Sequence, residues 1–130
     1  MKGYLKTTAG FVLSATMASV SHADVTIGEL QGFTGPLESM IGAMSGGANL
    51  AVTEANASGN YLQGTINVVQ GDSVCIDPAV AIAQAEKMIN DDNVMAIMGP
   101  NCSGNTGAVI TNVLVPNGIV SISPSATSPA

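Results

Sequence analysis

The chain is poor in basic residues and almost free of histidine. Its one histidine is His22, arginine is absent, and Lys87 is the one lysine between residues 24 and 130. Catalytic serines and cysteines usually need a histidine base, and zinc sites commonly use histidine ligands. Neither a Gly-x-Ser-x-Gly elbow nor a Gly-x-Gly-x-x-Gly dinucleotide fingerprint occurs. We therefore expect no enzyme, no bound metal and no cofactor.

The shortage of bases leaves the chain strongly acidic. All nine acidic residues lie between residues 24 and 130, and the whole chain has a formal net charge of −6. An acidic surface is repelled by the phosphates of nucleic acids and by anionic lipid headgroups. We expect neither to be a partner.

Residues 1–23 have the pattern of a cleavable secretory signal. Lys2 and Lys6 precede a mostly apolar or small stretch, which ends at Ser21-His22-Ala23, a small-x-small cleavage pattern. The apolar stretch is too short to span a bilayer, which needs about 20 apolar residues. We expect cleavage after Ala23, a single exported domain over residues 24–130, and no direct membrane insertion once the signal is removed.

Short β-type runs alternate with longer helical runs over the rest of the chain. The expected strands are residues 25–30, 65–69, 94–98 and 119–122, and the expected helices are residues 37–55, 78–90 and 104–115. This alternation predicts an α/β fold with a parallel sheet. Strands two and three are expected to flank strand one, which places a change of strand order beside strand one.

Two finer expectations concern the helices. Gly46 and Gly47 lie within the first helix at a cost of roughly 1 kcal/mol each relative to alanine, so we expect another element to approach closely there. Asp77 and Pro78 suit the start of the second helix. Its expected buried residues are Ala79, Ile82, Ala83, Met88 and Ile89.

Polar loops follow three of the expected strands. They are residues 31–36, 99–106 and 123–129, rich in glycine, serine and threonine. Parallel strands end at one edge of their sheet, where open α/β proteins bind ligands. The loop at 99–106 has P-loop spacing, but Asn105 stands where the phosphate-binding lysine would be. The loops therefore favour a small polar ligand, such as a carboxylate, over a nucleotide.

The two cysteines are Cys75 and Cys102. An even number of cysteines in an exported protein favours a disulfide. A reactive thiol at Cys102 is the alternative, although no histidine, lysine or arginine adjoins it in the sequence to lower its pKa. In the expected strand order, a disulfide requires two loops to bend across the end of strand one.

The motifs along the chain resemble those of the leucine/isoleucine/valine-binding proteins, the type I periplasmic binding proteins of branched-chain amino acid ABC transporters. The resemblance runs in order through residues 24–130. The matching motifs are Ile27-Gly28, Thr34-Gly35-Pro36, Gly47-Ala48-Asn49-Leu50-Ala51-Val52, Asn56-Ala57-Ser58-Gly59, Cys75-Ile76-Asp77-Pro78, Gly99-Pro100-Asn101-Cys102-Ser103 and Ile122-Ser123-Pro124-Ser125-Ala126-Thr127-Ser128-Pro129.

The resemblance implies a set of ligand-binding residues in this chain. Ser103 would hold the ligand carboxylate through its hydroxyl and N–H, Ser125 would offer its carbonyl to the α-ammonium, and Thr127 would add hydroxyl and N–H contacts. Met40 and Asn101 stand where leucine-binding members place Tyr and Leu. Cys102, beside Asn101, is included among the candidate ligand-binding residues, and Cys75 and Cys102 fall on the family's disulfide positions.

The resemblance also implies architecture and function. The fold would be the N-terminal part of lobe 1, a three-layer, Rossmann-like α/β unit that is incomplete without the second lobe. The expected function is the periplasmic substrate-binding component of an ABC transporter, which captures a branched-chain or similar small amino acid, or an amide, and delivers it to a membrane permease. A sensor or receptor domain of the same fold is the alternative.

Overall fold

The computed structural model describes residues 24–61 and 64–128. The expected signal sequence therefore lies outside the described residues. Within the described part of the chain, no helix is both long and apolar enough to cross a membrane.

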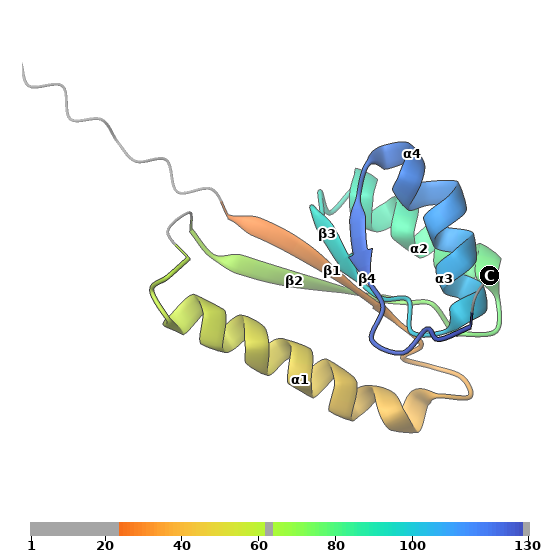
Figure 1. Ribbon diagram of the computed structural model, residues 1–130, viewed down its shortest axis with the longest axis horizontal. Coiled ribbons are helices and arrows are strands. Elements are labelled where there is room, and N and C mark those ends of the chain that lie inside the picture. Colours follow the sequence, from red (N-terminus) through yellow and green to blue (C-terminus); the bar gives the residue numbers. More distant parts are fainter. Residues whose placement is uncertain (1–23, 62–63, 129–130) are drawn as a thin grey trace, which may run out of the picture.

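Four parallel strands form a single sheet in the order β2-β1-β3-β4 (Figure 1). The strands are β1 (Val25–Gln31), β2 (Ile66–Asp72), β3 (Ala96–Met98) and β4 (Val120–Ile122). Ile27 of β1 lies between Val68 of β2 and Ala96 of β3. The prediction of an α/β fold with β2 and β3 on either side of β1 is confirmed.

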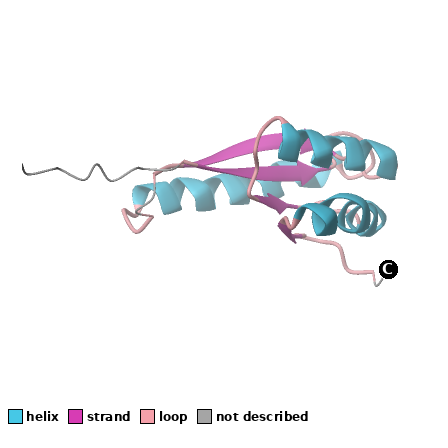
Figure 2. Ribbon diagram, turned by 90° about the horizontal axis from the view of Figure 1, so that it is seen from above, coloured by secondary structure: helices cyan, strands magenta, loops and turns pink. Residues whose placement is uncertain are grey.

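Helices lie on both faces of the sheet, as a parallel topology requires. They are α1 (Glu38–Ala57), α2 (Pro78–Asn90), α3 (Ser103–Val109), the π-helical segment η1 (Ile110–Leu114) and α4 (Val115–Asn117). The last three continue one another, so the third expected helix is present with one π-helical segment in it. Helix α1 covers one face, while α2 and α3 pack together on the other (Figures 1 and 2).

The apolar core lies between the sheet and the pair α2 and α3. Its buried members are Leu30, Ala81, Ala85, Met88, Val94, Ile97, Val109, Val113 and Leu114. Helix α2 begins as expected, because the Asp77 carboxylate accepts the N–H of Ala79 at 2.9 Å. The expected buried face of α2 is partly wrong. Ala81 and Ala85 are buried, whereas Ala79 and Ala83 are exposed.

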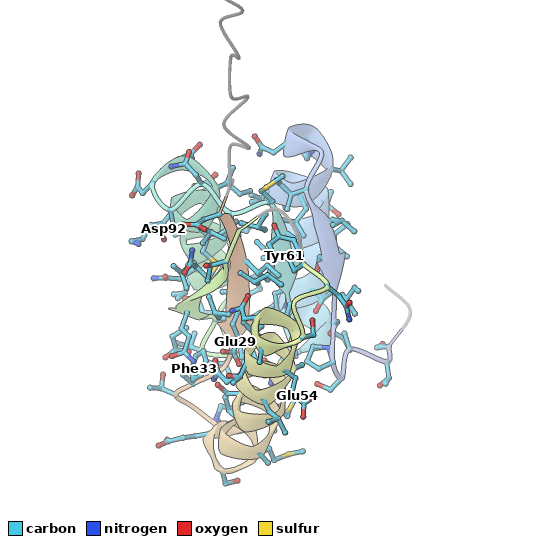
Figure 3. All side chains as sticks on the ribbon, turned by 90° about the vertical axis from the view of Figure 1, so that its left-hand side faces the viewer. Glu29, Phe33, Glu54, Tyr61 and Asp92 are labelled. Carbon is cyan, nitrogen blue, oxygen red and sulfur yellow. A yellow bond between two sulfur atoms is a disulfide. The ribbon has the colours of Figure 1, made fainter. Side chains whose placement is uncertain are left out.

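Helix α1 is attached to its face of the sheet in a different way. Its buried residues are Ile41 and Ser45. The Ser45 hydroxyl donates to the carboxylate of Glu29, which is 1 % exposed between α1 and the strands (Figure 3). Glu29 also accepts the side-chain amides of Gln31 at 2.6 Å and Gln70 at 2.9 Å. A buried polar network therefore joins α1 to β1 and β2.

The expectation of a close approach at Gly46 and Gly47 is wrong. Outside the helix's own backbone, no described atom lies within 4 Å of a Cβ built at either position. Both glycines are exposed on the outer surface of α1. Farther along the same face of the sheet, Val120 and Ile122 of β4 are also exposed, and they border an apolar groove of about 370 Å³.

Candidate functional site

The polar loops meet at the edge of the sheet where the four strands end. Strand β1 ends at Gln31, β2 at Asp72, β3 at Met98 and β4 at Ile122. All four strands are parallel, so the loops that follow them emerge on the same side (Figure 1). This is the side on which open α/β folds bind ligands, next to a change in strand order.

Ser103 begins α3 and joins two of these loops. Its hydroxyl oxygen accepts the backbone N–H groups of Thr127 and Ser128, both at 3.2 Å. The loop after β4 thus folds back over the start of α3. Two adjacent backbone donors of the final loop therefore converge on the Ser103 hydroxyl.

Two adjoining hollows border Ser103. One, of about 440 Å³, is lined by Ser103, Gly104, Gly107, Ala108, Thr111, Asn112 and Ser128. The other, of about 290 Å³, is lined by Ser103, Thr106, Gly107, Ile110, Ser121, Ser123, Ala126 and Ser128. Both are open to solvent along α3. Hydroxyl-bearing residues from α3, β4 and the final loop thus border a shallow groove.

Asn101 lies beneath this groove rather than along it. Its side chain is 3 % exposed, and its Oδ1 accepts the N–H of Gly32 at 2.9 Å. Its Nδ2 is buried and has no acceptor among the described residues. The side chain therefore fastens the end of β1 to the loop that carries Ser103.

Asn105 provides a second anchor that sequence reasoning missed. Its Nδ2 donates to the carbonyl of Ser73 at 2.7 Å, and the residue is almost fully buried. Asn101 and Asn105 are four residues apart and reach the ends of β1 and β2, respectively. In the sequence, Asn105 was notable only because it stands where a P-loop has lysine.

Gly99 shows how tightly the loop after β3 is packed. Its φ is +118°, and a Cβ at this position would collide with the carbonyl of Leu30 in β1. A side chain would therefore be excluded both by the backbone conformation and by the neighbouring strand. The loop approaches β1 closely because this residue is glycine.

Cys75 and Cys102 meet across the end of β1. Their sulfur atoms are within bonding distance, and their Cα atoms are 5.5 Å apart. Gly32, just after β1, lies beneath this crossing, since a Cβ there would be 3.3 Å from the Cβ of Cys75. The two loops therefore bend across strand one, as a disulfide between these cysteines requires.

Met40 lies apart from these contacts. It is in the first turn of α1 and is 56 % exposed. Neither hollow beside Ser103, as the described residues define them, includes it. Its expected part in ligand selection stays a prediction.

The loop after β1 is held by Asp72 at the end of β2. The Thr34 hydroxyl donates to one carboxylate oxygen at 2.6 Å, and the N–H of Val74 donates to the other at 2.9 Å. Burial alone would raise the pKa of Asp72, but these hydrogen bonds outweigh it and hold the pKa below its ordinary value of 3.8. Across residues 24–61 and 64–128, no three His, Cys, Asp or Glu side chains gather to hold a metal ion.

Comparison with known proteins identifies the family. The family model described as periplasmic binding protein matches residues 24–130. The chain belongs to this family. The parallel sheet with its loop-lined edge agrees with lobe 1 of the type I fold of periplasmic binding proteins.

Individual members of the family are clearly similar to the chain. Leu/Ile/Val-binding protein BraC3 of Rhizobium johnstonii is 33% identical over 126 residues, which cover 96% of this chain and 34% of that protein. The Leu/Ile/Val-binding protein of Escherichia coli K12 is 34% identical over 101 residues, which cover 69% of this chain and 27% of that protein.

A solved structure gives the same result. The branched-chain amino acid transporter substrate binding protein LivJ of Streptococcus pneumoniae, solved in complex with isoleucine, is 33% identical. It superposes with a TM-score of 0.75 over 83% of this chain and 30% of that one. The chain therefore spans about a third of the length of these relatives.

Proposed function

We propose that the chain supplies one side of the ligand site of a periplasmic substrate-binding protein, which captures a small amino acid or amide for an ABC permease. The main support is the convergence of the Ser103 hydroxyl and the Thr127 and Ser128 N–H groups beside an open groove. The Ser103 hydroxyl is a donor, and a hydroxyl donor matches a ligand carboxylate. In this proposal, residues 1–23 direct export to the periplasm, and the protein binds its ligand without transforming it.

The individual residues have different parts in this proposal. Ser103 and Thr127 donate to the ligand carboxylate, and the Ser125 carbonyl accepts from the α-ammonium. Asn101 supports the site through its hydrogen bond to Gly32. Cys102 is the residue before Ser103, and its bond to Cys75 fixes its position. Met40 borders the ligand from α1 when the full site is assembled.

The ligand class proposed first is a branched-chain amino acid. Support comes from relatives named Leu/Ile/Val-binding proteins and from the isoleucine bound to the Streptococcus protein. Because one lobe provides only part of such a site, we expect millimolar affinity, roughly −4 kcal/mol of binding free energy.

An NMR titration of the purified chain with L-isoleucine tests the proposal. We expect the amide signals of Ser103, Thr127 and Ser128 to shift saturably, and isoleucinol, which has no carboxylate, to leave them unchanged. Ser103→Ala removes a hydrogen bond to a charged group and should weaken binding about tenfold or more. Ser39→Ala, at an exposed serine of α1, is the matched control and should bind as the parent does. Equal shifts with isoleucinol, or no shift with L-isoleucine, would exclude the proposal.

A further inference from the structure

Three serines of β4 and the following loop form a regular set of hydrogen bonds with the loop after β3. They occupy alternate positions, and their hydroxyls donate to three consecutive carbonyls. The bonds run from Ser121 Oγ to Gly99 at 2.5 Å, from Ser123 Oγ to Pro100 at 2.5 Å, and from Ser125 Oγ to Asn101 at 2.7 Å. We refer to Ser121, Ser123 and Ser125 as the serine ladder.

The spacing of the serine ladder follows from the extended chain. Side chains two residues apart in a strand point to the same face. In β4, Ser121 faces α3, where it lines the hollow beside Ser103, while Val120 and Ile122 face the apolar groove on the opposite side. Ser123 continues the α3-facing row past the end of β4, and Ser125 follows it with the third bond. The ladder thus extends the contact between two neighbouring segments after their backbone pairing has ended.

The ladder also determines where the final loop goes. The Ser123 oxygen, which donates to Pro100, accepts the N–H of Ala126 at 2.9 Å and so turns the chain back. The next two N–H groups, those of Thr127 and Ser128, then reach Ser103. Apart from half-buried Ala126, residues 124–128 are exposed. Apolar packing therefore contributes little to holding this loop, and hydrogen bonds must hold it.

We propose that Ser121, Ser123 and Ser125 are positioning residues, which hold the Thr127 and Ser128 N–H groups against Ser103 before any ligand arrives. The hydroxyls of the ladder are engaged by backbone carbonyls and do not touch the ligand themselves. Their effect on affinity rests on the proposed function. A binding loop that is already held in place needs less ordering when the ligand binds, which strengthens binding.

Amide hydrogen exchange of the purified chain, followed by NMR without ligand, tests the ladder directly. Removing a hydroxyl by Ser123→Ala deletes one bond to Pro100 and one acceptor for Ala126. We expect the amides of Thr127 and Ser128 to exchange about three- to tenfold faster, which is the scale of one or two modest hydrogen bonds. The amide of Leu30 in β1 should be unchanged, since the sheet remains folded.

Two matched pairs separate positioning from general destabilisation. Ser123→Thr keeps the hydroxyl and should retain slow exchange at Thr127, whereas Ser123→Val has a similar shape without the hydroxyl and should behave like Ser123→Ala. Thr53→Ala removes a hydroxyl-to-carbonyl bond from the exposed surface of α1 and should leave the final loop unaffected. Equal exchange in the Thr and Val variants, or unchanged exchange in Ser123→Ala, would overturn the proposal.

Titration with L-isoleucine then connects the ladder to binding. We expect Ser123→Ala to weaken affinity about three- to tenfold and Ser123→Thr to restore it. If the parent chain does not bind L-isoleucine, the proposed function fails, while the exchange result still decides the ladder. If the parent binds and all variants bind equally, the ladder does not position the site.

Discussion

The two faces of the sheet are covered by different kinds of contact. On the face covered by α2 and α3, Leu30 and Ile97 pack into a continuous apolar cluster. On the face covered by α1, the contacts under the helix include the buried polar network around Glu29, and β4 leaves Ile122 exposed. Helices α2 and α3 are held on their face by close apolar packing. Helix α1 is held on the other face by hydrogen bonds to the carboxylate of Glu29.

This difference affects how much each face contributes to the stability of the fold. A packed apolar core gains stability in proportion to the area it removes from water. A buried polar network contributes less net stability, because its groups were already hydrogen-bonded to water in the unfolded chain, but it is costly to break. We therefore infer that the α2 and α3 face carries most of the stability, while the Glu29 network fixes the placement of α1.

The largest expected effect comes from shortening a side chain on the packed face. Leu30→Ala should lower the free energy of unfolding by about 2–5 kcal/mol, because it removes fully buried methyl groups and leaves a cavity. Ile122→Ala, on the exposed side of β4, should change it by less than about 0.5 kcal/mol. Urea unfolding of both variants gives the comparison. Similar losses in the two would mean that the faces do not differ as described.

The next effect breaks the polar attachment of α1. Glu29→Ala leaves the buried donors of Gln31 and Ser45 without this acceptor and should cost about 1–3 kcal/mol in urea unfolding. Glu54→Ala, at an exposed glutamate of α1, is the control and should change the free energy of unfolding by less than about 0.5 kcal/mol. A Glu29 variant as stable as the control would show that α1 is held by other contacts.

Two glycines, one on the outer surface of α1 and one in the packed core, give effects of opposite sign. Gly46→Ala meets open space on α1 and should stabilise the protein by roughly 0.5–1 kcal/mol, because alanine favours helix. Gly28→Ala places its Cβ 2.9 Å from the Met88 sulfur in the packed core, so it should destabilise. Thermal unfolding midpoints should move in opposite directions. A lower midpoint for Gly46→Ala would reveal a packing partner on the outer surface of α1.

The smallest expected effect concerns the loop edge, which belongs to neither face. The folded-state pKa of Asp72 is lowered by hydrogen bonds from Thr34 and Val74, so its contribution is present above the ordinary value of 3.8 and is lost as pH falls through the lower folded value. Asp72→Asn should therefore differ more from the parent at pH 7 than at pH 3 in urea midpoints. An equal difference at the two pH values would show that the Asp72 carboxylate makes no pH-dependent contribution to stability.

The parallel α/β fold followed from the sequence because its signals agreed with one another. Apolar runs that end in polar loops alternate with helical runs, and only parallel crossovers connect them simply. The buried face of α2 was harder to predict. Positions 79, 81, 83 and 85 are all alanine, so residue type does not distinguish them. The buried pair, Ala81 and Ala85, lies on the same helix face as Met88.

The candidate site was predictable as a location but not as a set of contacts. The sequence indicated which loops meet, because parallel strands end together. It did not indicate that Asn105 reaches the carbonyl of Ser73, or that alternate serines reach consecutive carbonyls. Such bonds depend on irregular loop backbone, for which side-chain periodicity gives no information.

The meeting of Cys75 and Cys102 has a consequence for how the chain responds to cutting. Once oxidised, the two cysteines close a covalent ring that contains α2 and β3. A protease that cleaves one peptide bond inside this ring would leave both fragments joined, so the protein would run as one species on a gel until a reductant is added. A cut within α2 would therefore go undetected on a non-reducing gel.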